Sequence, residues 1–225
     1  MMIFHFECER GCLIMMNLRN QAFPMRYAKN LAKPYAFCAL QKQIKQCTKC
    51  EHCRKTEELT LWGSSNATLL VILSWPDMSL NETALLKNVF DFYKVDPDIL
   101  AFTYAYHCNA YSSHHIRPPF RQEIENCVAY THQAIDIIEP LAILCLSSIS
   151  SNLFYRQSLS DSIKEPTFIQ NIPIFTTYPP SYILNLYNSK NSLYESKNIE
   201  FYTNIKRALD YLEEKYPKLA IYKES

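Results

Sequence analysis

The chain has 225 residues, of which 48% are hydrophobic and 20% charged, so it can bury the core of one large domain and is not disordered overall. Its net charge of +1 identifies no partner by itself. Only two glycines are present, where average usage of about 7% would give roughly sixteen. Neither GxGxxG nor a Walker A loop exists in the sequence, which excludes the glycine-rich sites that bind nucleotide cofactors.

The first residues, MMIFHFECERGCLIMM, place acidic residues and cysteines where a signal peptide needs a basic end and an apolar run. No window is long and apolar enough to span a membrane. We therefore expect a cytoplasmic protein with no membrane contact, in which clustered cysteines bind metal more often than they form disulfides. Residues 1–35 are predicted to be an N-terminal extension, partly disordered or preceding the true translation start.

Positive charge gathers near this end of the chain. From Gly11 to Thr56, nine basic residues stand against one acidic residue, Glu51, so this segment carries +8 and the rest of the chain −7. A local basic segment fits a polyanion such as nucleic acid. A solvated face that keeps the chain soluble explains the same charges equally well.

The first half of the chain alternates between helical and extended patterns. A helix is predicted over residues 36–46, followed by a loop that holds a cysteine cluster. The run ATLLVIL at 67–73 is continuously apolar with β-branched members, which is typical of a buried parallel strand. Asn81 is predicted to cap a helix that runs to residue 93.

The second half repeats the alternation. The expected elements are a strand at 100–106, a helix at 118–139 opened by two prolines, a strand at 141–146, a short helix capped by Ser147, a strand at 172–178 and a helix at 197–216. This order predicts an α/β fold with a central, mainly parallel four-stranded sheet covered by helices on both faces. The domain is predicted to span 36–216, with a C-terminal tail at 217–225. Ligands in such folds bind beyond the carboxyl ends of the strands.

Four cysteines form the most specific pattern. Cys47 and Cys50 make a CxxC at a helix end, Cys108 follows the second strand, and Cys127 lies on the next helix. Four thiolates suit either an iron–sulfur cluster or zinc, and spacing alone does not separate the two. Cys53 makes a second CxxC with Cys50, so Cys53 can replace Cys47 or Cys50 in the ligand pair. Cys8, Cys12, Cys38 and Cys145 are interpreted as small buried hydrophobic residues, as Cys127 would be if taken alone.

The stretches EIENCVAYTHQAIDIIEPLAILCLSSISSNLF at 123–154 and IPIFTTYPPSYILNLYNSK at 172–190 resemble the family-4 uracil-DNA glycosylases, the iron–sulfur branch of that superfamily. The likeness covers residues 36–214 and includes the CxxC, the cysteine after the second strand and the Arg117-Pro118-Pro119 sequence. It implies a three-layer α/β/α sandwich. It also implies a 4Fe–4S cluster on Cys47, Cys50, Cys108 and Cys127.

The chain departs from the family at the positions that act on uracil. Ser74 and Trp75 replace the acidic motif after the first strand, and Pro179 replaces the motif histidine. An asparagine that reads the base edge aligns with Tyr104. Because Pro179 offers no donor and Ser74 no carboxylate, these changes favour the loss of uracil excision, and no residue is assigned a catalytic role.

Binding can persist where catalysis is lost. Pro180, Ser181 and Tyr182 match the family loop that presses on DNA, and Tyr182 is expected either to stack on a base or to pack its own helix. The leading hypothesis is a monomeric, DNA-binding protein with lost or altered activity. The alternatives are an active glycosylase that uses Asp77 or His107 on uracil or another damaged base, and a zinc-stabilised structural module.

Overall fold

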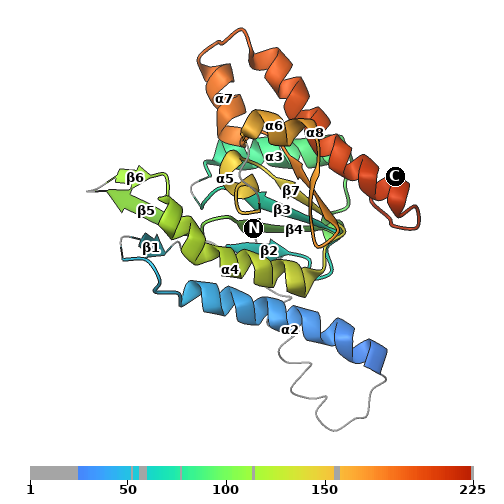
Figure 1. Cartoon of the computed structure of the whole chain (residues 1–225). Coiled ribbons are helices and arrows are strands. Elements are labelled where there is room, and N and C mark those ends of the chain that lie inside the picture. The colour runs from blue at the N-terminus through green and yellow to red at the C-terminus, as the bar shows by residue number, and fades with distance from the viewer. Residues whose placement is uncertain are drawn as a thin grey trace.

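The computed structural model describes residues 25–51, 53–55, 60–76, 78–112, 115–154 and 158–223. In chain order, the elements are α2 (Met25–Lys45), β1 (Cys53–Lys55), β2 (Leu61–Gly63), β3 (Leu69–Leu73), α3 (Leu80–Phe92), η1 (Pro97–Ile99), β4 (Leu100–Tyr104), β5 (Cys108–Ser112), β6 (His115–Arg117), α4 (Arg121–Ile138), β7 (Ala142–Cys145), α5 (Ser148–Ser151), α6 (Leu159–Lys164), β8 (Thr167–Ile169), β9 (Ile172–Thr176), α7 (Pro180–Asn188) and α8 (Tyr194–Lys215). Figure 1 shows their arrangement around the sheet.

The main sheet has six strands in the order β2-β4-β3-β7-β9-β8. Its four central strands pair in parallel and correspond to the four strands expected from the sequence. The edge strands β2 and β8 pair antiparallel and were not predicted. The α/β class and the mainly parallel sheet are therefore confirmed, while the strand number is corrected from four to six.

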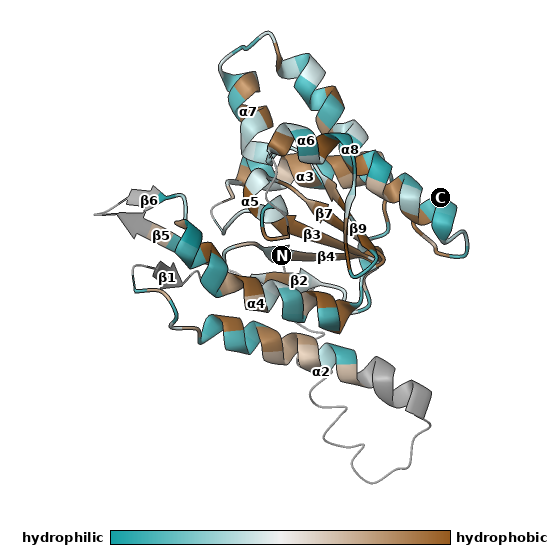
Figure 2. Cartoon of the chain, viewed as in Figure 1, coloured by the Kyte–Doolittle hydropathy of each residue, from teal (hydrophilic) through white to brown (hydrophobic). Residues whose placement is uncertain are grey.

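The central strands are almost entirely apolar because both faces of the sheet are buried. Along β3, Leu69, Val71 and Leu73 belong to one core cluster, whereas Leu70 and Ile72 belong to another. This is the two-residue alternation of a strand whose two sides both face packed helices. Figure 2 shows the hydrophobic colour concentrated in these strands.

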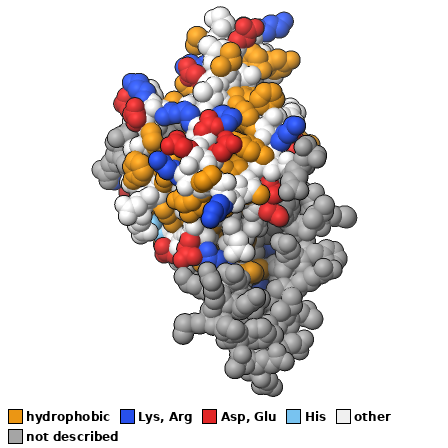
Figure 3. Space-filling view, turned by 90° about the vertical axis from the view of Figure 1, so that its right-hand side faces the viewer, with side chains coloured by type: hydrophobic (Ala, Val, Ile, Leu, Met, Phe, Trp, Pro, Cys, Tyr) orange, Lys and Arg blue, Asp and Glu red, His pale blue; other side chains and the backbone are white. Residues whose placement is uncertain are grey.

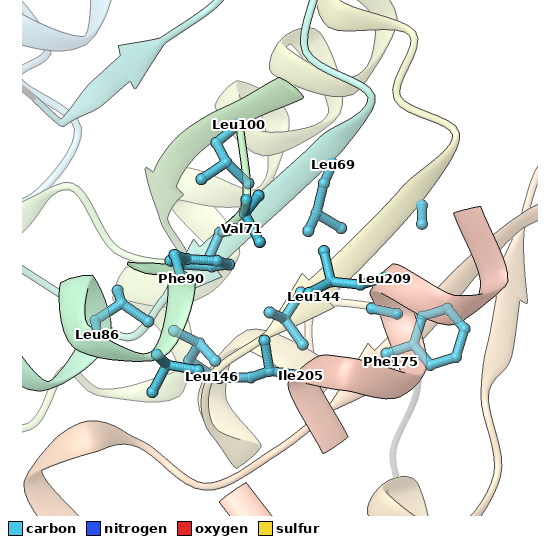
Figure 4. Close-up of a cluster of buried hydrophobic side chains, with 14 of the residues drawn as sticks. Leu69, Val71, Leu86, Phe90, Leu100, Leu144, Leu146, Phe175, Ile205 and Leu209 are labelled. Carbon is cyan, nitrogen blue, oxygen red and sulfur yellow. The ribbon is translucent and has the colours of Figure 1, made fainter. Parts of the chain in front are cut away.

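Each core cluster joins the sheet to a different set of helices. The first contains buried side chains of α3, α7 and α8, including Leu86, Phe90, Ile205 and Leu209, which converge on the strands in Figure 4. The second contains side chains of α2 and α4, such as Phe37 and Ile135.

A separate three-stranded sheet, β1-β5-β6, is entirely antiparallel. Strands β5 and β6 form a hairpin in which Ser112 pairs with His115. Its first residue is Cys108, so this small sheet positions one of the four candidate ligands.

Four helix starts differ from the sequence-based expectation. Helix α4 begins at Arg121, after the two prolines that were expected to open it, and α8 begins at Tyr194 rather than at residue 197. Helix α2 begins at Met25 rather than at residue 36, so it includes part of the predicted extension; residues 1–24 lie outside the described part of the chain. Helix α3 is capped by Ser79, not Asn81: Ser79 Oγ accepts from the Glu82 N–H, and Glu82 Oε2 accepts from the Ser79 N–H. This reciprocal capping box satisfies two backbone donors at once.

The segment predicted as a C-terminal tail packs against the domain. Ile221 is buried in the first core cluster, and its carbonyl accepts a hydrogen bond from the Asp96 N–H. Among the described residues, no helix is long and apolar enough to cross a membrane.

Candidate metal centre and strand-end cavity

The four candidate ligands come from three parts of the fold. Cys47 and Cys50 are half-buried in the loop after α2, while Cys108 and Cys127 are buried at the start of β5 and on α4. Because α2 packs along α4, the end of α2 is brought to the part of α4 that carries Cys127 (Figure 1). Cys108 and Cys127 share a small cluster, against which Cys50 packs.

Tyr130, one turn after Cys127, lies at the point where the thiols meet. Its hydroxyl forms a hydrogen bond with Cys47, and Cys108 and Cys127 are near enough to influence it electrostatically. Burial, followed by this Cys47 contact, raises the pKa of Tyr130. The Lys49 ammonium lies 4.5 Å from the centre of the Tyr130 ring. The structure therefore brings three of the four predicted cysteines together around one tyrosine.

The cysteine loop is tied to α4 by Asn126. Its Nδ2 donates to the Lys49 carbonyl at 3.4 Å and to Cys50 Sγ at 3.5 Å, and Lys49 Nζ donates back to the Asn126 carbonyl at 3.4 Å. Amide donors directed at cysteine sulfur are one of the means by which proteins tune iron–sulfur clusters. They also stabilise negative charge on a thiolate.

Within the described residues, no group of three or more His, Cys, Asp or Glu side chains is arranged to hold a single metal ion. A tetrahedral zinc with bonds of about 2.3 Å requires its sulfurs within about 3.8 Å of each other. A polynuclear cluster spreads its thiolates more widely, so this finding concerns single ions and not a cluster. The donor set itself, two buried and two half-buried thiols, fits a 4Fe–4S group.

The other cysteines have different environments. Cys145 is fully buried on β7, as interpreted from the sequence, and burial raises the pKa of its thiol. Cys38 is half-buried and takes part in a disulfide, so its interpretation as a simple hydrophobic residue was wrong. The side chain of Cys53 lies outside the described residues, as do Cys8 and Cys12.

The start of α4 is held by a buried ion pair. Both guanidinium nitrogens of Arg117 donate to the Glu123 carboxylate at 2.8 Å, and the Phe120 N–H donates to the same carboxylate at 2.6 Å. The Arg117 guanidinium also lies 3.8 Å from the centre of the Phe120 ring. Since Cys127 follows Glu123 by four residues, this pair anchors the helix turn that leads to the ligand.

A cavity of about 590 Å³ opens at the carboxyl ends of β3, β7 and β9. Its wall contains the residues singled out from the sequence at these strand ends: Ser74, Trp75, Ser147, Pro179, Pro180, Ser181 and Tyr182. Pockets of 300–1,000 Å³ are typical of ligand sites. Residues that follow three of the four central strands therefore line one cavity at this edge of the sheet, which is where folds of this class bind ligands.

Trp75 connects the cavity with the cysteines. Its side chain lines the cavity and also packs against the cluster formed by Tyr106, Cys108, Ala110 and Cys127.

Tyr178 is fixed at the cavity wall by two charged residues of α8. Its hydroxyl donates to Glu200 Oε2 at 2.6 Å and accepts from Lys197 Nζ at 2.9 Å. Burial and the Glu200 contact raise the pKa of Tyr178, whereas the Tyr178 hydrogen bond, together with Lys197, lowers the pKa of Glu200. The ring of Tyr178 lies 5.1 Å from that of Tyr182, at an interplanar angle of 32°.

Tyr104, which replaces the family's asparagine, and His107, a candidate substitute donor, do not line the cavity. Tyr104 is buried and packs on the Trp62 ring, 5.3 Å away. His107 is buried edge-on to Tyr130, and burial lowers its pKa to about 4, so the ring is neutral at pH 7. Asp77 lies outside the described residues.

Two cavity residues, Glu82 and Tyr178, were not assigned a role from the sequence. Glu82 could have been found through the Ser79-x-x-Glu82 spacing, which is the signature of a capping box and places its carboxylate at the start of α3. Nothing in the sequence around Tyr178 indicates the partners that come from α8.

Most side chains of the predicted basic segment fall outside the described residues. Of those described, Lys33 pairs with Glu139 at 2.8 Å and donates to the Ile138 carbonyl. On the face shown in Figure 3, side chains of both charge signs are interspersed with hydrophobic ones.

Comparison of the chain with protein-family models and with curated proteins gives no match.

Proposed function

We propose that this chain is a divergent member of the uracil-DNA glycosylase superfamily, with a three-layer α/β/α sandwich, that binds DNA as a monomer without excising uracil. We further propose that Cys47, Cys50, Cys108 and Cys127 hold a 4Fe–4S cluster. The observation that carries the proposal is the grouping of the four thiols, beside a cavity at the carboxyl ends of the parallel strands: Cys47, Cys108 and Cys127 interact with Tyr130, and Cys50 packs against the cluster that contains Cys108 and Cys127.

The proposed cluster has a structural role. Bound by four thiolates, it would tie the loop after α2 to β5 and α4, three segments that are far apart in the sequence. The chain's own residues support this role, because Asn126 and Lys49 hold the loop against α4 and Trp75 closes one side of the cysteine cluster.

Binding is assigned to the aromatic wall of the cavity. Tyr182 is partly exposed at the start of α7, next to Tyr178, and both rings line the cavity. A base turned out of a DNA strand would stack on such a surface. Excision also requires a donor for the departing uracil anion and a group that positions water. Pro179 and Ser74 provide neither at the positions where the family has them.

DNA binding is tested by fluorescence anisotropy with a labelled single-stranded oligonucleotide over a range of salt concentrations. We expect affinity to fall as salt rises, and Tyr182→Ala to weaken binding roughly tenfold, because one base–aromatic stack contributes about 1–3 kcal/mol. Tyr187→Ala is the matched control, since Tyr187 lies on the same helix but is 60% exposed and does not line the cavity. Absence of binding at low salt contradicts the DNA-binding proposal.

Loss of excision is tested separately. The protein is incubated with a uracil-containing duplex, and abasic sites are detected by strand cleavage in alkali. We expect an intact duplex. Release of uracil would show that other residues have replaced the missing groups, and the activity proposal would be wrong while the DNA-binding proposal stands.

A further inference from the structure

We infer that the strand-end cavity selects a base that carries an amino group, such as cytosine, and that the Glu82 carboxylate makes the selection. The inference deepens the proposed DNA binding and rests on it for the source of the base. It rests on three features of the cavity: aromatic walls, a single charged side chain among the described residues that line it, and the fixed position of that side chain.

The walls provide flat surfaces on more than one side. Trp75 comes from the segment after β3, whereas Tyr178 and Tyr182 come from the segment after β9 and the start of α7. Tyr178 is held by Lys197 and Glu200, so its ring is ordered before any ligand arrives. Aromatic surfaces of this kind bind any planar heterocycle and do not discriminate between bases.

Discrimination therefore requires a polar group, and Glu82 is placed to supply it. Its Oε2 is occupied by the Ser79 N–H at 2.6 Å, which fixes the carboxylate at the start of α3. A carboxylate has two oxygens and accepts hydrogen bonds only. Because Glu82 lines the cavity and its Oε2 is held by the helix cap, the carboxylate can present its second oxygen to a ligand there.

An acceptor of this kind separates the two pyrimidine classes. Cytosine presents an exocyclic amino group, to which Glu and Asp are the usual acceptors. Thymine and uracil present a carbonyl oxygen at the ring position where cytosine has this amino group, and a carboxylate repels that oxygen. The cavity therefore favours cytosine over thymine and uracil, which agrees with the absence of the family's uracil-reading asparagine at Tyr104.

The test compares pyrimidine ligands of matched size. A labelled dC10 and a labelled dT10 are titrated with wild-type protein and with Glu82→Gln, and free deoxycytidine and thymidine are titrated by calorimetry. Glutamine retains a side-chain oxygen for the Ser79 cap, so Glu82→Gln removes the charge and preserves the helix start. Glu214→Gln, which removes an exposed charge near the end of α8, is the matched control.

We expect wild-type protein and Glu214→Gln to prefer dC10 over dT10 roughly tenfold, and Glu82→Gln to lose the preference while keeping its affinity for dT10. Equal affinity of wild-type protein for the two strands, or a preference unchanged in Glu82→Gln, overturns the inference and leaves the DNA-binding proposal intact. Binding of deoxycytidine without binding of either strand supports the inference and contradicts DNA binding. No binding of any ligand overturns both.

Discussion

The ion pair between Arg117 and Glu123 allows the most direct test of how the start of α4 is held. The side chains are only 14% and 12% exposed, and two hydrogen bonds of 2.8 Å join them. Removing one member of a buried pair leaves the other without compensation, which costs about 3–5 kcal/mol. Because some water reaches both groups, we expect Glu123→Ala to lower the free energy of unfolding by about 3 kcal/mol, the low end of this range.

Glu125→Ala is the matched control. It lies on the same helix and pairs with Arg121 at 2.7 Å, but the side chains are 67% exposed at Arg121 and 48% at Glu125. Exposed pairs spaced four residues apart on a helix contribute about 0.3–0.5 kcal/mol. The two substitutions thus remove the same chemical group from neighbouring positions that differ in burial.

Urea unfolding followed by far-UV circular dichroism measures both effects. With a slope of about 2 kcal/mol per molar urea, the midpoint should fall by about 1.5 M for Glu123→Ala and about 0.2 M for Glu125→Ala. Similar midpoints for the two variants would show that the Arg117–Glu123 pair does not anchor α4, and the reasoning would be refuted.

Two further predictions concern the edge of the sheet and the cavity wall. Gly63→Ala should destabilise the protein by about 2 kcal/mol in the same urea assay, because φ is +98° and the added Cβ would meet the Leu100 carbonyl oxygen at 2.5 Å; an unchanged midpoint would contradict this. The hydrogen bond from Tyr178, together with Lys197, holds the pKa of Glu200 below its usual value. The ionised Glu200 carboxylate therefore stabilises the folded protein. This stabilisation is fully present above the unfolded-state pKa of about 4.3 and is lost as the pH falls through the lower folded-state pKa. Glu200→Gln should therefore be less stable than wild type at pH 7 and equally stable at pH 2, and a pH-independent difference would refute the assignment.

The sequence predicts those parts of the fold in which one physical signal dominates. Continuous apolar runs identify β3 and β7 because both faces of these strands are buried. The edge strands β2 and β8 were missed because each has three residues, too few for a periodic pattern. The sequence predicts Asn81 as the cap of α3 because Asn and Ser cap helices about equally well. The spacing of Ser79 and Glu82, which allows two reciprocal hydrogen bonds, identifies Ser79 as the cap instead.

The candidate site was predictable only where the order of the elements determines it. Strand ends on one edge of a parallel sheet must lie together, so topology predicts that Trp75 and Tyr182 line the same cavity. Whether a side chain beyond a strand faces the cavity or the core depends on the exact residue at which the strand ends. His107 is for this reason buried beside Tyr130 rather than exposed to a ligand.

The central claim, a cluster on four cysteines, is tested most directly by the iron content and visible spectrum of protein purified without oxygen, beside Cys127→Ala and Cys145→Ala. Both cysteines are buried, but only Cys127 belongs to the group around Tyr130. We expect a brown wild-type protein with about four irons per chain, loss of iron and colour in Cys127→Ala, and retention of both in Cys145→Ala. A colourless wild-type protein that carries zinc or no metal, or equal iron content in the two variants, would contradict the claim.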